Sequence, residues 1–224
     1  MQEHTAKEQE VLNGAGLFSG ITGKEIETLL PCLSAKKRTY AKDETVLSAG
    51  EKVAFVGIVL SGELLAERLS LYGDRSIVQA FLPGDSFGLA RAVLPDAPSD
   101  VDIMAGQDCA VLFLSPSGIF HTCGKACSFH AGLVDNAVRL LARKNLSLNE
   151  KLVHVSQKTT RDKVLSYLTA IAARTGKRSF DIPFDRQGLA DYLNVDRSGL
   201  SFELSKMKKD GLIDCRKNHF TLLT

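Results

Sequence analysis

The sequence predicts an α+β chain that begins with a β-roll of the cupin or jelly-roll type over residues 1–126, continues through a long helix over 127–155, and ends in a winged helix-turn-helix over 156–224. Three observations carry this prediction. Short apolar runs alternate with glycine turns in the first part, a heptad pattern fills the second, and two short capped helices precede a hairpin in the third.

Composition places the chain among ordinary globular proteins and narrows the choice of partners. Hydrophobic residues make up 44% of the sequence and charged residues 24%, a balance that does not favour disorder. Residues 156–224 hold 13 Lys and Arg against 8 Asp and Glu, whereas residues 1–155 hold 15 against 18. A basic C-terminal third on a slightly acidic body indicates a polyanion partner for that third alone.

The sequence also argues against several classes of protein. No apolar run is long enough to span a membrane, and the polar N-terminus does not resemble a signal peptide, so we expect a cytoplasmic protein without a membrane partner. The five cysteines are scattered, which favours reduced thiols over a disulfide framework. No nucleophile–base pair or set of metal ligands is visible, so we expect neither an enzyme nor a cofactor or metal site.

The first part of the chain changes from a helical to a β pattern. Residues 1–34 are expected to be helical, because Ile26, Leu29 and Leu33 recur at helical spacing. From about residue 36 to 115, β-rich runs lie between glycines at near-regular intervals, as in an all-β roll or barrel. Examples of these runs are Val53–Leu60, Leu64–Leu69, Ile77–Leu82, Val101–Ala105 and Ala110–Leu114.

The long helix carries a heptad series. From Cys127 to Val155, apolar residues recur at alternating steps of four and three, a seam typical of helices that pair with a partner helix. Asn145 is its one strongly polar member, and such a residue can fix register and oligomeric state. The predicted interface of a homodimer consists of Val134, Val138, Leu141, Asn145, Leu148 and Leu152.

A second apolar row allows another interpretation of this helix. Leu133, Ala137 and Leu140 could pack the helix on its own domain. The two rows are compatible, because one can face the partner subunit while the other faces the roll.

The C-terminal third has the signals of a winged helix-turn-helix. Thr159 or Thr160 can cap a helix that runs to about Arg174, and Phe180–Pro183 is a short strand. Asp185 and Asp196 are good N-caps for two further helices, Asn194 suits the tight turn between them, and Gly211 suits the position after the second. Segments Leu212–Asp214 and His219–Leu222 can pair as a hairpin through Lys217-Asn218, which forms the wing.

The outward face of the second of these helices favours DNA as the polyanion. Small hydroxyl side chains and an Arg near a helix N-terminus suit entry into the major groove. The candidate base-reading residues are Arg197, Ser198, Ser201 and Phe202. Candidate phosphate contacts, which position a protein without reading sequence, are Arg186, Gln187, Lys206, Lys208 and Lys209. An ordinary helical hairpin with a solvated polar face is the alternative.

Nearly the whole chain resembles the Crp–Fnr superfamily of bacterial transcription regulators. The most specific stretches are Arg186–Ile213, Pro83–Gly88 and Ser61–Leu64. The resemblance implies a cyclic-nucleotide-binding-type effector domain at 1–126, a dimerisation helix at 127–155 and a DNA-binding domain at 156–224. It also implies a palindromic operator in double-stranded DNA and contact with RNA polymerase.

The sensor region departs from the cyclic-AMP-responsive members of that family. Those members follow the glycine of the motif with a Glu that holds the ribose and, ten residues later, have an Arg-Ser pair that holds the cyclic phosphate. Here Leu89 follows Gly88, and the pair falls on Ser99-Asp100, so an anion would meet a like charge. We expect an unknown small-molecule effector rather than cyclic AMP, in a pocket formed by Gly88, Leu89, Arg91, Ser99, Asp100, Leu148 and Asn149.

The chain also lacks the residues with which other members of the family bind an iron–sulfur cluster or haem. Only Cys32 lies in the first 100 residues, so the cysteine cluster of the oxygen-sensing members is missing. Cys123 and Cys127 are expected to be small buried residues, and Cys215 is expected to pack in the wing. His121 and His130 are expected to be surface or capping residues rather than haem ligands.

The recognition helix departs as well. Many members have Arg, then Glu, and after three more residues a second Arg that reads guanine. Arg197 matches the first position, but Ser198 replaces the Glu and Phe202 replaces the second Arg. Phe can contact a thymine methyl group but cannot donate to guanine, so we expect a half-site that differs from the common one, or weaker binding.

The sequence therefore predicts a homodimeric, sequence-specific DNA-binding transcription regulator controlled by an effector in the roll. The alternative is a cyclic-nucleotide-type binding module whose C-terminal domain contacts proteins instead of DNA, which Phe202 slightly favours.

Overall fold

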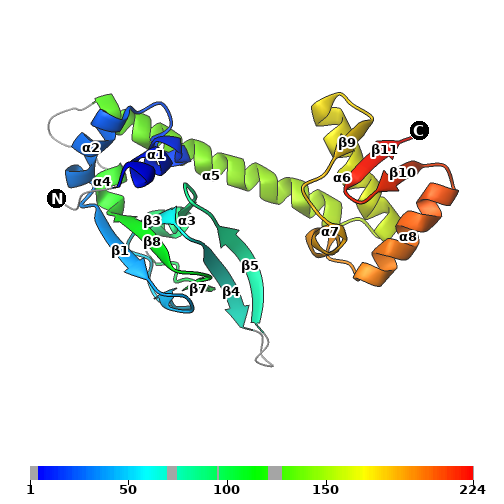
Figure 1. The fold of residues 1–224 in the computed structure, drawn as a ribbon, viewed down its shortest axis with the longest axis horizontal. Helices are drawn as coiled ribbons and strands as arrows, with labels where there is room; N and C mark the ends of the chain where they lie inside the picture. The colour runs from blue at the N-terminus through cyan, green and yellow to red at the C-terminus, as the bar shows by residue number, and fades with distance from the viewer. Residues whose placement is uncertain (1–4, 70–74, 95, 121–127, 224) are drawn as a thin grey trace. The chain divides into compact units, whose positions relative to one another are not determined.

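The computed structural model divides the chain into two compact units, 1–142 and 143–224 (Figure 1). The boundary lies inside the long helix α5, Ser128–Val155, so the helix expected over residues 127–155 is confirmed over all of its described residues. The residues that the structure describes are 5–69, 75–94, 96–120 and 128–223.

The N-terminal unit is built on two antiparallel four-stranded sheets, as the β-roll prediction requires. One sheet has the order β1 (Lys36–Tyr40), β8 (Cys109–Leu114), β3 (Val56–Ser61) and β6 (Ser86–Phe87). The other has the order β2 (Thr45–Leu47), β7 (Asp102–Ala105), β4 (Leu64–Leu69) and β5 (Arg75–Phe81).

Helices cover the first of these sheets. In this unit the described helices besides α5 are α1 (Ala6–Gly14), η1 (Gly16–Phe18), α2 (Gly23–Cys32), α3 (Leu89–Val93) and α4 (Pro116–Phe120). Helix α1 begins at a capping box in which the Thr5 side chain accepts the Glu8 N–H and Glu8 accepts the Thr5 N–H. The expectation that residues 1–34 are helical is thus confirmed for most of that range.

Strands β3 and β8 separate two hydrophobic cores. Successive side chains of a strand point to opposite faces, and here both faces are covered. Ile58 and Leu112 pack with the helices, whereas Val59 and Val111 pack with residues of the other sheet between the two sheets. Burial on both sides explains why these two strands appear in the sequence as continuous apolar runs rather than alternating ones.

The core between the sheets depends on a glycine. A Cβ atom on Gly57 would lie 2.2 Å from the Phe87 ring, so only glycine lets β6 bring Phe87 this close to β3. Phe87 in turn contacts the rings of Phe55, Phe81 and Phe113. An aromatic cluster therefore fills this part of the roll.

The C-terminal unit has the predicted order of elements around a single core. Its three-stranded sheet has the order β10 (Ile213–Arg216), β11 (His219–Leu222) and β9 (Ser179–Asp181). Its helices, besides the end of α5, are α6 (Thr160–Thr175), α7 (Arg186–Leu193) and α8 (Arg197–Lys209). The fold class expected from the sequence is confirmed.

Candidate nucleic-acid interface and sensor site

Helices α7 and α8 form the predicted helix-turn-helix because side chains cap both. The Asp185 carboxylate accepts the Gly188 N–H at 2.7 Å, and the Asp196 carboxylate accepts the Gly199 N–H at 2.7 Å. Asn194 takes the left-handed conformation, with φ 51°, in the turn between the helices. Gly211 is left-handed just after α8, at the C′ position. These four local predictions are confirmed.

The two faces of α8 differ sharply in polarity. Leu200, Leu204 and Met207 are buried in the core of the C-terminal unit. On the other side, Phe202 is 72% exposed, an unusual position for an aromatic ring on a polar face. Four predicted contact residues, Arg197, Ser198, Lys206 and Lys209, are exposed, and Ser201 is half-buried.

Two basic residues of α6 bind α8 and the turn between α7 and α8. The sequence analysis did not predict these contacts. The Arg161 guanidinium binds the Glu203 carboxylate at 2.6 Å and the Asp210 carboxylate at 2.7 Å. The Lys163 Nζ atom donates to the carbonyl oxygens of Leu193 and Asn194, at 3.3 Å each. These carbonyls end α7 and enter the turn, so a cation there also complements the negative end of the helix. Long-range pairs of this kind leave no periodic signal in the sequence.

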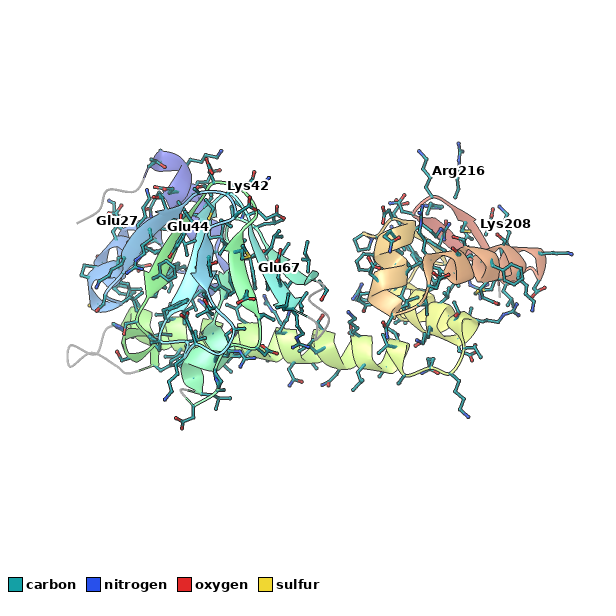
Figure 2. All side chains as sticks on the ribbon, turned by 90° about the horizontal axis from the view of Figure 1, so that it is seen from below. Glu27, Lys42, Glu44, Glu67, Lys208 and Arg216 are labelled. Atoms are coloured by element: carbon teal, nitrogen blue, oxygen red, sulfur yellow. The ribbon has the colours of Figure 1, made fainter. Side chains whose placement is uncertain are left out.

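The wing carries further basic residues. Lys217 takes the left-handed conformation in the turn between β10 and β11. Arg216 is exposed and projects from this hairpin (Figure 2). Lys208 was predicted as a phosphate contact, but its Nζ atom lies 2.6 Å from the Asp214 carboxylate of β10. Its charge is therefore partly neutralised within the domain. Cys215 packs against the core of this unit, as expected.

The two predicted phosphate contacts at the start of α7 are held in different ways. Arg186 is half-buried, and its Cζ atom lies 6.0 Å from the centroid of the buried Phe220 ring. Gln187 is exposed and donates to the Asp191 carboxylate at 2.8 Å. Arg186 therefore packs against the core as well as presenting a charge.

Helix α5 has an exposed apolar stripe where the heptad series predicts an interface. Leu148 is 56% exposed and Leu152 is 62% exposed, and Val138 is similarly open. Asn145 is exposed and accepts from the Asn149 side chain at 2.8 Å. Val134 and Leu141 are only half-buried, and Leu141 also touches the core of the N-terminal unit.

The second apolar row of α5 packs inward, as the alternative interpretation expects. Leu133 and Ala137 are fully buried in the helical core of the N-terminal unit, and Leu140 packs against it. Asn136 strengthens this contact, because its amide donates to the carbonyl oxygens of Leu17 and Ser19. One row of α5 is thus used within the unit, and the other is open.

The charged residues of the predicted effector region form ion pairs. Gly88 is left-handed at the N-terminus of α3, and Leu89 is buried. The Asp100 carboxylate binds Arg91, and at 2.5 Å it also binds Arg68 of β4. Partial desolvation raises the pKa of the Asp100 carboxyl, but the charges of Arg91 and Arg68 and the hydrogen bonds to the carboxylate outweigh this effect and lower the pKa.

Both charged residues of the predicted effector pocket, Arg91 and Asp100, therefore have partners within the N-terminal unit. Arg91 is not a free surface cation, because Asp100 pairs with it and Pro98 accepts from it. Asp100 is exposed rather than buried, so it does not carry the cost of an uncompensated buried charge. Ser99 is buried and donates to the Val101 carbonyl. Leu148 and Asn149 belong to the other unit, beyond the residue of α5 at which the chain divides.

The cysteine and histidine predictions have mixed outcomes. Cys32 is exposed and Cys109 is buried. Cys123, Cys127 and His121 lie outside the described residues. The expectation for His130 was wrong, because this residue, near the start of α5, is buried with 1% of its surface exposed. Among the described residues no cluster of His, Cys, Asp or Glu could hold a metal ion. No described helix is long and apolar enough to cross a membrane.

Comparisons with known proteins agree with this geometry. Residues 37–124 match the family of cyclic nucleotide-binding domains, and residues 162–224 match the family of Crp-like helix-turn-helix domains. The transcriptional activator protein FnrL of Cereibacter sphaeroides is 25% identical over 84% of this chain and 76% of its own length.

Solved structures support the same fold. CprK complexed with OCPA superposes with a TM-score of 0.59 at 14% identity, over 89% of each chain. The N-terminal domain of a transcriptional regulator from Streptomyces coelicolor superposes with a TM-score of 0.52 at 18% identity, over 60% of this chain and 94% of that one.

A cyclic-nucleotide-binding-type roll followed by a Crp-like helix-turn-helix defines a class of helix-turn-helix transcription regulators. Both parts occur here in that order, and the predicted resemblance is confirmed. The chain belongs to the Crp–Fnr superfamily of bacterial transcription regulators.

Proposed function

We propose that the protein is a homodimeric transcription regulator that reads a palindromic DNA operator with α8. The observation that carries this proposal is the capped, exposed face of α8, with Arg197 at its start and Phe202 near its middle. Recognition helices of helix-turn-helix proteins place their N-terminal residues against base edges in the major groove. Here those residues combine one guanidinium, small hydroxyl groups and one aromatic ring.

The basic residues around α8 support a DNA partner. Among the described residues, no carboxylate lies within ion-pair distance of Arg186, Lys206 or Lys209, and Arg216 extends from the wing. Contacts of this kind to phosphates supply affinity that falls steeply with salt. Gln187 at the start of α7 adds a neutral donor.

The exposed stripe of α5 supports the dimer. Val138, Leu148 and Leu152 would be buried against the same residues of a second copy, and Asn145 would fix the register. A two-fold dimer presents two recognition helices, and therefore matches a palindrome. The family resemblance adds contact with RNA polymerase as a further expectation.

Control by an effector completes the proposal. The roll would bind a small molecule other than cyclic AMP, near Gly88, Leu89 and Ser99, and the ion-paired Arg91 and Asp100 would respond to it. The ligand would act by shifting the population of arrangements in which the two α8 helices fit DNA.

A protein partner for the C-terminal domain is the second candidate function, and the exposed ring of Phe202 favours it. Selection of bound DNA from a random pool, with and without cell extract, tests the first proposal. A palindromic consensus supports DNA reading, and a requirement for extract supports an effector. Failure to enrich any sequence at low salt contradicts DNA reading and leaves the protein partner.

A further inference from the structure

A groove of about 360 Å³ lies beside the edge strand β1 of the N-terminal unit. Its walls come from β1 and the residue two before it, from β2, from the segment before β3, and from the end of β8 with the residue that follows. Two cationic side chains, Lys36 and Arg38, line it together with three rings, those of Tyr40, Phe55 and Phe113. Positive charge and aromatic surface therefore meet in one hollow.

The register of β1 explains why these side chains gather there. Alternate residues of a strand share a face, so Lys36, Arg38 and Tyr40 point the same way. Lys36 lies directly opposite Phe113 of β8 in the antiparallel ladder. Lys37 points to the other face, where its Nζ atom binds the buried Glu8 carboxylate at 2.6 Å. Of the three basic residues of β1, Lys37 is therefore used in an ion pair within the unit, whereas Lys36 and Arg38 line the groove.

The rings form a fixed platform. The Phe55 and Phe113 centroids are 4.8 Å apart with the ring planes at 89°, and Tyr40 also meets Phe113 edge-on, at 6.3 Å. Edge-to-face contacts of this kind are favourable and hold the rings in place. The Arg38 Cζ atom lies 6.0 Å from the Phe113 centroid, so the guanidinium borders the apolar surface.

The charges of the groove are uncompensated. Among the residues that the structure describes, no acidic side chain lines it, and no carboxylate lies within ion-pair distance of Lys36 or Arg38. By contrast, Arg91 and Arg161 are bound to carboxylates elsewhere in the chain. The Tyr40 hydroxyl can also donate, because a tyrosine is protonated at neutral pH and burial raises the pKa of Tyr40 further.

We propose that this groove binds a small aromatic anion, a ring-bearing carboxylate or sulfonate. The ring would lie against Phe55 and Phe113, and the acidic group would take up the guanidinium of Arg38 and the ammonium of Lys36. The volume of the groove is typical of a small-molecule site. A ring that carries one acidic group would complement both the aromatic and the cationic side chains that line the groove. Because only the N-terminal unit is involved, the proposal is independent of DNA reading by α8.

Calorimetric titration of the full-length protein with naphthoate tests the proposal, with naphthylmethanol as the uncharged analogue of the same shape. Naphthoate should bind, and naphthylmethanol should bind about tenfold more weakly because it lacks the charge-assisted contacts. Arg38→Gln should weaken naphthoate binding about fivefold, as expected for a partly exposed ion pair. The matched control is Lys42→Gln, because Lys42 (labelled in Figure 2) follows β1 in the chain and is not among the residues that line the groove.

A second variant keeps the test independent of charge. Ala54 lines the groove and is exposed, so Ala54→Trp should fill the hollow and abolish naphthoate binding without disturbing the core. Circular dichroism verifies that each variant is folded. Three results overturn the proposal: no binding of naphthoate, equal affinity for the two compounds, or equal effects of the Arg38 and Lys42 changes.

Discussion

The Nδ1 atom of His154 lies 2.8 Å from the Oγ atom of Ser166, which joins the last turn of α5 to α6. His154 is 4% exposed, and its ring meets Tyr167 of α6 edge-on at 5.6 Å and Tyr192 of α7 at 6.4 Å. This contact holds the end of the long helix on the helix-turn-helix. The position of helices α6 and α7 relative to the end of α5 therefore depends on a buried imidazole.

The first prediction is that this contact weakens in acid. Burial lowers the pKa of His154, and only the nearby Glu150 carboxylate opposes this effect, while Lys151 lies over Tyr192. The unfolded chain, with a histidine pKa of about 6.5, then binds the proton more readily than the folded one. The free energy of unfolding that His154 contributes is complete above that pKa and falls as the pH drops below it.

Hydrogen exchange of the α6 amides, measured from about pH 8 to about pH 5 with correction for intrinsic rates, checks this prediction. His154→Gln should reduce the loss of protection in acid. The control is His219→Gln, because His219 is exposed and pairs with Asp181 in the sheet. Identical pH profiles for the wild type and His154→Gln would show that His154 does not couple α5 to this domain.

The second prediction concerns the dimer. Leu148→Asp combined with Leu152→Asp should weaken self-association about a hundredfold or more, because each buried Leu contributes about 1.5–3 kcal/mol. Both residues are exposed in the single chain, so folding should be unaffected. Sedimentation measures the effect, and Val153→Asp is the matched control, since Val153 is exposed but outside the heptad series. A double variant that remains dimeric would place the interface elsewhere.

The third prediction is that cyclic AMP is not a ligand. Asp100 occupies the guanidinium groups of Arg68 and Arg91, and Leu89 offers no polar atom in its side chain for a ribose. Calorimetric titration should show no binding for the wild type. Asp100→Ala should not restore binding, because it frees the cations without supplying a ribose contact. Micromolar binding by either protein would refute this prediction.

The sequence predicted local features best. The caps Asp185 and Asp196, the turn at Asn194 and the strand runs around Ile58 and Val111 were all identified, because each depends on residues close in the chain. Strand β1 was missed because it is a polar edge strand with the sequence KKRTY. The strand is formed through its pairing with β8, a contact between distant parts of the chain that the local sequence does not indicate.

The ion pairs at the candidate sites could not be predicted, because they join residues that are far apart in the sequence. The pairing of Arg161 with Glu203 and Asp210, and of Arg68 and Arg91 with Asp100, joins residues far apart in sequence, with no spacing that announces it. His130 looked like a surface residue because one polar side chain in a heptad region carries no burial signal of its own. Its buried position follows from how α5 packs on the other helices.

The last prediction concerns DNA reading by α8. If the dimer binds a palindrome, its half-sites should be centred about one helical turn, roughly 34 Å, apart. Arg197→Ala should cost about 1–3 kcal/mol if Arg197 reads a base, and should relax the preference at one position in each half-site. Lys206 lies further along α8, so Lys206→Ala should weaken binding to all sequences alike and reduce the salt slope by about one unit.

Phe202→Arg distinguishes base reading from phosphate contact most directly. The exposed ring can only make an apolar contact, for which a thymine methyl group is the natural partner, whereas Arg can donate to guanine. The preferred base at the facing position should therefore change from thymine to guanine. Binding of each variant to a panel of single-base operator variants at several salt concentrations measures these effects. If all three substitutions change the affinity equally for every operator, α8 does not read bases, and the C-terminal domain binds DNA only through its charge.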